Sequence, residues 1–109
     1  MQTIMLNIGS KIIVVGKIIG DSFYMVRNRD KHFYRKYSGY AINKRILDRL
    51  NNLGIKKIYL KEADTDTEFM IPLDAFIENA IPIEWNGEIQ YCVPLEYWIK
   101  TNESLDKYI

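Results

Sequence analysis

The first forty residues carry the hydrophobic pattern of β-strands. The stretch "KIIVVGKIIG", residues 11–20, is rich in β-branched residues and is bounded by turn-forming residues, so it predicts a buried strand with a bend at Gly16. Residues 22–27 and 32–37 predict the two arms of a hairpin, with the turn at 28–31.

The pattern changes to a helical period at residues 43–53. Apolar residues recur there on one stripe, while charged and polar residues occupy the other positions. Asn43 is a suitable N-cap, and Gly54 can close the helix in the left-handed conformation. The apolar stripe consists of Ile46, Leu47, Leu50 and Leu53.

The remaining chain predicts short strands and short helices. Strands are expected within 55–61 and 68–73, a short helix at 74–80, a hairpin around Asn86 and Gly87, and a second short helix after Pro94. No linker or repeat divides the chain. The pattern therefore predicts a single α+β domain over 1–109, with a mostly antiparallel sheet of β-hairpins packed by the helix at 43–53 and one or two short helices.

Composition adds that this domain needs neither disulfides nor metal to fold. Of the 109 residues, 48% are hydrophobic, which is enough for a core. Cys92 has no second cysteine to pair with, as is usual in a reducing compartment. The first twenty residues show neither a signal peptide nor a membrane span, so a cytoplasmic location without a membrane partner is expected.

The net charge of +1 conceals an uneven distribution. Residues 1–61 hold thirteen Lys or Arg against three Asp or Glu, a balance of +10, and residues 62–109 hold two against eleven, a balance of −9. Such asymmetry indicates an electrostatic partner, unless the fold interleaves the two halves on one surface.

The densest basic stretch is "RNRDKHFYRKYSGY", residues 27–40, which combines five cations with four aromatic residues. Cations neutralise phosphates and aromatic rings stack on bases, so this mixture suits single-stranded nucleic acid. The alternative is a solvated hairpin whose tyrosines cover the edge of the core. The candidate nucleic-acid-binding residues are Arg27, Arg29, Lys31, His32, Tyr34, Arg35 and Lys36, extended on the helix by Lys44, Arg45 and Arg49.

The acidic stretch "EADTDTE", residues 62–68, raises the question of a metal site. Its carboxylates recur at every second position, but the calcium-loop template fails because the required Gly and closing Glu are absent. A metal-dependent nuclease would use Asp64, Glu68 and Lys61, and a polar turn explains them more simply. No catalytic residue, metal or other cofactor is predicted, and the lone His32 and Cys92 do not form a zinc set.

An interaction module is the second hypothesis. Aromatic residues cluster near the C-terminus among glutamates, so an acidic and aromatic patch could meet the basic half of a second copy or of another protein. The partners considered are therefore DNA or RNA, a homo-oligomer, and an acidic protein. The leading expectation is a non-enzymatic nucleic-acid-binding protein.

Several segments resemble small proteins of archaea, their viruses or plasmids, and phages. The resemblance rests on "HFYRKYSGYAI", "ILDRLNNLGIKKIYL" and "IQYCVPLEYW", and covers about two thirds of the chain. It implies a small accessory protein of a mobile element, and it carries over no activity. The matching positions are Tyr34, Arg35, Lys36, Gly39, Tyr40, Ile42, Gln90 and Pro94.

Overall fold

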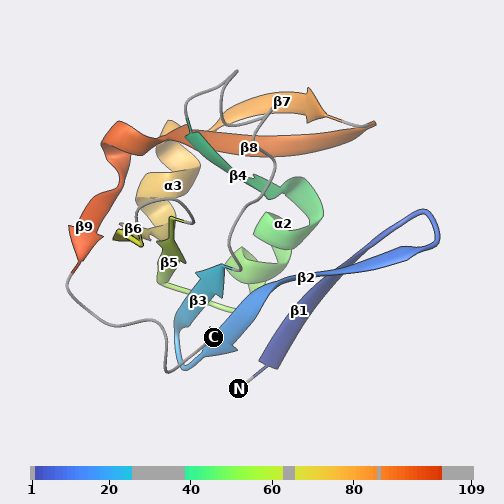
Figure 1. The fold of residues 1–109 in the computed structure, drawn as a ribbon, viewed down its shortest axis with the longest axis horizontal. Coiled ribbons are helices and arrows are strands. Elements are labelled where there is room, and N and C mark those ends of the chain that lie inside the picture. The colour runs from blue at the N-terminus through green and yellow to red at the C-terminus, as the bar shows by residue number, and fades with distance from the viewer. Residues whose placement is uncertain (1, 26–38, 63–65, 86, 102–109) are drawn as a thin grey trace.

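The computed structural model describes residues 2–25, 39–62, 66–85 and 87–101. Nine strands and two α-helices lie in these ranges (Figure 1). The elements in chain order are β1 (Gln2–Ile8), β2 (Lys11–Ile19), β3 (Ser22–Met25), β4 (Gly39–Asn43), α2 (Lys44–Asn52), β5 (Lys57–Lys61), β6 (Glu68–Pro72), α3 (Leu73–Asn79), β7 (Ile81–Trp85), β8 (Glu88–Pro94), the short 3-10 helix η1 (Leu95–Tyr97) and β9 (Ile99–Thr101).

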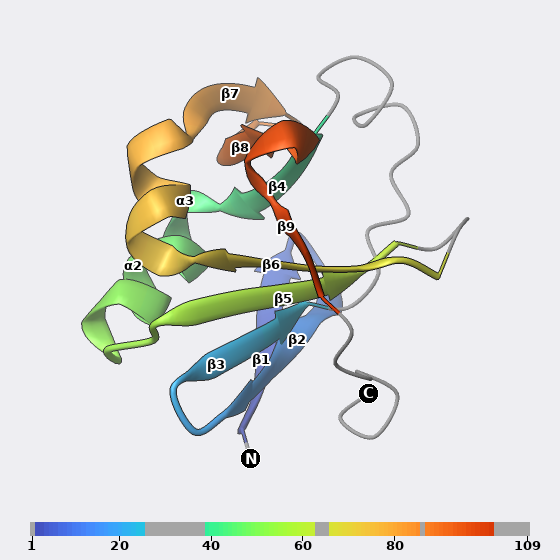
Figure 2. The ribbon, with the colours of Figure 1, turned by 90° about the vertical axis from the view of Figure 1, so that its left-hand side faces the viewer.

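The strands form two sheets. One has six strands in the order β1-β2-β3-β5-β6-β9, and the other has three in the order β4-β8-β7. Only β3 and β5 pair in parallel among the described strands; the other pairs are antiparallel. Figure 2 shows the three-stranded sheet above the six-stranded one, with both helices on the same side of the molecule. The predicted α+β class with mostly antiparallel pairing is confirmed.

One hydrophobic core joins the two sheets and both helices. Its side chains with almost no exposed surface include Phe23 and Ile58 from the larger sheet, Val93 from the smaller sheet, Leu50 from α2 and Phe76 from α3. Removing apolar surface from water is the main source of stability for such a domain. The two sheets therefore depend on each other for their burial.

Helix α2 begins and ends as its sequence predicts. The Asn43 side chain accepts a hydrogen bond from the Arg45 amide at 2.9 Å, which satisfies one of the free donors at the helix start. Gly54 has a φ of +74°, and the amide of Ile55 donates to the Leu50 carbonyl at 3.1 Å, which closes the helix in the Schellman arrangement. Leu53 departs from the predicted stripe, because it is the C-cap residue and is exposed.

The strand predicted as the first arm of a hairpin at 22–27 is present as β3, but its predicted pairing with 32–37 is wrong. Strand β3 is already flanked on both edges, by β2 on one side and β5 on the other. Residues Ser22 to Tyr24 pair on both sides, so they leave no free edge at which the arm predicted at 32–37 could pair. Residues 28–37, with the predicted turn and second arm, lie outside the described part of the chain.

Strand β2 is only half buried, in contrast to the prediction. Its residues from Gly16 to Ile18 lie in or near the core, while residues 11–14 are exposed. A β-bulge separates the two parts: Ile4 pairs with Gly16 and Met5 with Val14, so Val15 has no partner. A Cβ at Gly16 would lie 2.5 Å from the Tyr24 carbonyl oxygen, so the close approach of β3 requires glycine there.

Candidate nucleic-acid interface

The basic and aromatic segment connects the two sheets. It leaves the buried end of β3 at Met25 and enters the smaller sheet at Gly39, the first residue of β4. Seven of the predicted contact residues belong to this connection and lie outside the described residues, so their role stays a prediction. They are Arg27, Arg29, Lys31, His32, Tyr34, Arg35 and Lys36.

Lys44, the first residue of α2, has an acidic partner one turn along the helix. Its Nζ lies 2.9 Å from the Asp48 Oδ2, and both side chains are exposed. The hydrogen bond and the negative charge of Asp48 raise the pKa of Lys44. Water and salt screen such a pair, so its contribution to stability is small. Lys44 can therefore still meet a phosphate, at the expense of its contact with Asp48.

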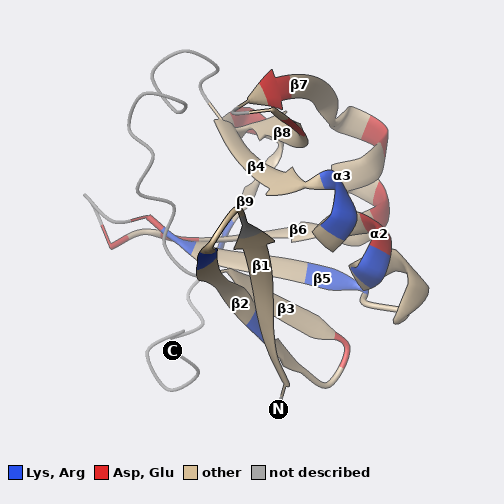
Figure 3. Ribbon diagram, turned by 90° about the vertical axis from the view of Figure 1, so that its right-hand side faces the viewer, with Lys and Arg blue, Asp and Glu red and all other residues tan. Residues whose placement is uncertain are grey.

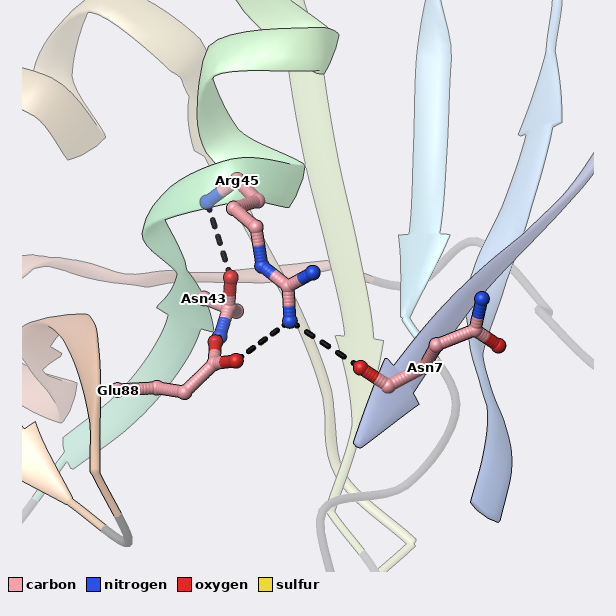
Figure 4. Close-up of polar contacts among 4 residues, drawn as sticks. All are labelled: Asn7, Asn43, Arg45 and Glu88. Atoms are coloured by element: carbon pink, nitrogen blue, oxygen red, sulfur yellow. Dashed lines mark hydrogen bonds and ion pairs between the residues drawn. The ribbon is translucent and has the colours of Figure 1, made fainter. Parts of the chain in front are cut away.

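Arg45 is a connector between elements that are distant in sequence (Figure 4). Its Nη2 donates to the Glu88 Oε1 at 2.5 Å and to the Asn7 carbonyl oxygen at 3.2 Å. The guanidinium thus links the start of α2 to β8 and to β1. The sequence analysis missed Asn7 and Glu88, because contacts across 38 and 43 residues have no signal in local spacing.

Glu88 receives a second hydrogen bond, from the Asn43 side-chain amide to its Oε2. This hydrogen bond, together with that of Arg45 and its positive charge, lowers the pKa of Glu88. Asn43 therefore has two roles, since its oxygen caps α2 while its nitrogen holds the carboxylate (Figure 4). Because the Glu88 carboxylate partly neutralises Arg45, this arginine would attract an incoming phosphate less strongly than an unpaired arginine would.

Arg49 differs from Lys44 and Arg45. It lies exposed in the last turn of α2, where a cation is favourable next to the free carbonyl groups, and no ion pair joins it to another described residue. Lys56 and Lys57 follow after the helix and are also exposed. Both of their amides donate to the Asp21 carbonyl oxygen, so an acidic residue lies close to them.

Cations and carboxylates are mixed around α2. Figure 3 shows the Lys and Arg positions of α2 and β5 close to Asp and Glu positions of neighbouring elements. The ion pairs of Lys44 with Asp48 and of Arg45 with Glu88 are both part of this mixture. The helix therefore does not continue the strong positive charge of the 27–36 segment unchanged.

Two of the three candidate nuclease residues, Lys61 and Glu68, lie at one end of β5 and β6. Lys61 is buried and stands directly opposite Glu68, while Asp64 is outside the described residues. Beside them the Tyr40 hydroxyl donates to the Glu62 Oε2 at 3.0 Å, which links β4 to the end of β5. Within the described ranges, no group of three or more His, Cys, Asp or Glu side chains is placed to share a metal ion.

Cys92 is buried in β8. Desolvation raises its pKa to about 11, so the thiolate that a nucleophile requires is scarce at neutral pH. His32, the other half of a conceivable Cys-His pair, is not among the described residues. None of the helices in the described ranges is long and apolar enough to cross a membrane.

Five residues of the resemblance pattern come together where β4 pairs with β8. Gly39 is opposite Pro94, and Gln90 is opposite Asn43. A Cβ at Gly39 would lie 2.5 Å from the Val93 carbonyl oxygen and 2.9 Å from the Pro94 Cα, so only glycine fits without a shift. Tyr40 and Ile42 point into the core. Packing between the two strands therefore explains why these residue types occur there.

Comparisons with known proteins assign no family. No family model matches the chain, and no curated protein matches it. A solved structure described as a nuclease from a fusselovirus aligns with a TM-score of 0.49 and 14% sequence identity. The alignment covers 90% of this chain and 58% of the nuclease chain, so this chain spans little more than half of that protein's length. The likeness is distant, and the function proposed below rests on residues of this chain.

Proposed function

We propose that this protein binds nucleic acid without catalysing a reaction, through the basic and aromatic segment at 27–37. The observation that carries the proposal is the composition of that segment: five cations and four aromatic or histidine rings stand among eleven residues, with one carboxylate at Asp30. A dense group of cations attracts anionic partners. Nucleic acid supplies both a dense row of anions and flat bases.

The aromatic residues favour single strands over duplexes. Tyr34, Tyr37 and Phe33 can stack on exposed bases, and each stacked base contributes about 1–3 kcal/mol in proteins of this kind. In a duplex the bases are already stacked on each other. We therefore expect single-stranded DNA or RNA to bind more tightly than duplex DNA of the same length.

The folded domain supports this role through its exposed cations. Arg49, Lys56 and Lys57 are exposed around the C-terminal end of α2 and the start of β5. Lys44 and Arg45 contribute less, because Asp48 and Glu88 already neutralise them. The segment at 27–37 is thus the main contact, and α2 is an auxiliary one.

Fluorescence anisotropy with short labelled oligonucleotides, single- and double-stranded, tests this proposal. The variant Arg35→Ala/Lys36→Ala removes two cations from the segment. The matched control, Lys11→Ala/Lys100→Ala, removes two exposed cations from β2 and β9 and so has the same net charge. Affinity should fall for the first variant and change little for the control.

The dependence on salt gives the second readout. If two phosphate contacts are lost, the slope of log K against log salt for a single strand should become shallower by about 1.4. Equal losses for both variants would mean that net charge alone drives the binding, which contradicts a specific segment. No binding at low salt and micromolar protein would refute the proposed function.

A further inference from the structure

The hairpin of β1 and β2 carries an apolar surface that the core does not use. Met5 and Val14 are directly opposite each other, and Ile12 follows on the same face. Their exposed fractions are 53%, 43% and 69%, although an outer strand face next to water is normally polar. We name Met5, Ile12 and Val14 the hairpin patch. Figure 1 shows the end of this hairpin extending beyond the rest of the fold.

The charged side chains of the β1–β2 hairpin are all positive. Residues 2–20 contain Lys11 and Lys17 and no Asp or Glu. Lys17 pairs with Thr3, which lies two residues from Met5, so its side chain is on the same face as the patch. In addition, β1 is an outer strand of the six-stranded sheet, with β2 as its one neighbour among the described strands. An exposed apolar edge of this kind favours association with another protein surface.

The same chain presents a complementary surface on α3. Asp74, Ile77 and Glu78 recur at intervals of three and four residues, so they share one face of the helix, and Ile81 follows as the first residue of β7; all four are exposed. Ile77 and Ile81 are 44% and 53% exposed. The chain has no Lys or Arg from residue 62 to residue 99. We name these four residues the α3 stripe.

We propose that the hairpin patch of one copy docks on the α3 stripe of a second copy. Both surfaces combine exposed apolar side chains with charges of one sign, and the signs are opposite. One molecule therefore carries both halves of a matching contact, and a second copy is the partner that the chain itself defines. The contact joins copies head to tail into a ring or an open chain, or pairs two copies about a two-fold axis if the hairpin of each reaches the stripe of the other.

Charge reversal provides the sharpest test, because it can be undone by mixing. Lys17→Glu lowers the charge of the hairpin from +2 to 0, and Glu78→Lys raises the charge of the stripe from −2 to 0, so each variant loses the attraction between its own two surfaces. Glu78 is chosen for the substitution rather than Asp74, because Lys56 lies close to the first turn of α3. The Leu73 amide donates to the Lys56 carbonyl there. In sedimentation velocity without nucleic acid, each variant alone should self-associate at least about tenfold more weakly than the native protein.

An equimolar mixture of the two variants should associate again. The unaltered basic hairpin of the Glu78→Lys variant then meets the unaltered acidic stripe of the Lys17→Glu variant, which is the native combination. If two hairpins contacted each other symmetrically instead, Glu78→Lys would not weaken self-association. Failure of the mixture to associate, or a native protein that is monomeric at every concentration and salt condition, would overturn the proposal.

The apolar part of the contact has its own control. Ile12→Thr/Val14→Thr keeps the β-branched shape and the charge while removing apolar surface, and should weaken association about tenfold. Leu53→Thr removes an equally exposed apolar side chain from the end of α2 and should leave association unchanged. Circular dichroism and thermal melting verify that each variant is folded. Equal weakening by both variants would contradict the hairpin patch.

Discussion

The start of α2 and the end of the β1–β2 hairpin both carry cations, but the fold surrounds them differently. Arg45 donates to Glu88 and to the Asn7 carbonyl, and so connects three elements. The outer half of the hairpin has Lys11, exposed isoleucines and no carboxylate nearby in sequence. A count of charges treats these cations as equal. Arg45 is held by contacts to other elements, including the Asn7 carbonyl of the hairpin itself, whereas Lys11 and the exposed side chains of residues 12–14 lie on the outer part of the hairpin.

The largest difference between the two regions is expected in the free energy of unfolding, when an apolar side chain of each is shortened to alanine. Leu50 is fully buried, whereas Ile13 on β2 is 45% exposed. Leu50→Ala leaves a cavity and should lower the free energy of unfolding by about 2–5 kcal/mol. Ile13→Ala should change it by about 0.5 kcal/mol or less, as for surface sites. Urea denaturation measures both, and similar losses would mean that the hairpin end is packed after all.

A smaller effect is expected at the N-cap of α2. Asn43→Ala removes the hydrogen bond to the Arg45 amide and the one to Glu88, and should cost about 1 kcal/mol. Asn43→Asp is the matched variant: it keeps the capping oxygen and puts a carboxylate next to Glu88. If Asn43→Ala were as stable as the native protein, neither bond would matter for the fold.

The smallest effect is the dependence of stability on pH. Hydrogen bonds from Asn43 and Arg45 hold the pKa of Glu88 below its ordinary value of 4.5 in the folded protein. The unfolded chain therefore binds this proton first, and the stabilisation is complete above pH 4.5 and declines as the pH falls through the lower folded value. The stability difference between the native protein and Glu88→Gln should shrink below pH 4.5. A difference that stays constant on acidification would show that Glu88 is not stabilised by these contacts.

The sequence predicts local features of this fold well and distant contacts poorly. Asn43 and Gly54 mark the ends of α2 correctly, because caps act within a few residues. The parallel pairing of β3 with β5 brings together residues about 35 apart, and no local pattern indicates it. The exposure of residues 12–14 was missed for a similar reason, since apolar character alone does not reveal how far the core extends.

The sequence predicted the candidate site only through its residue composition. The 27–36 segment stands out in sequence, and Lys44, Arg45 and Arg49 were rightly expected on one helix. The carboxylate that neutralises Arg45 comes from β8, so its presence depends on the tertiary fold. Lys56 and Lys57, which the proposed function adds as auxiliary cations, were not among the predicted residues, although their proximity to Arg49 in the chain was a usable signal.

The most direct test of nucleic-acid binding is a residue-resolved NMR titration with a short single-stranded oligonucleotide. The account predicts that amide shifts change in residues 27–37, with smaller changes at Arg49, Lys56 and Lys57 and none at Met5, Ile12 or Val14. These shifts should disappear when salt is added. No shift in residues 27–37 while the oligonucleotide is in excess, or shifts confined to the hairpin patch, would contradict it.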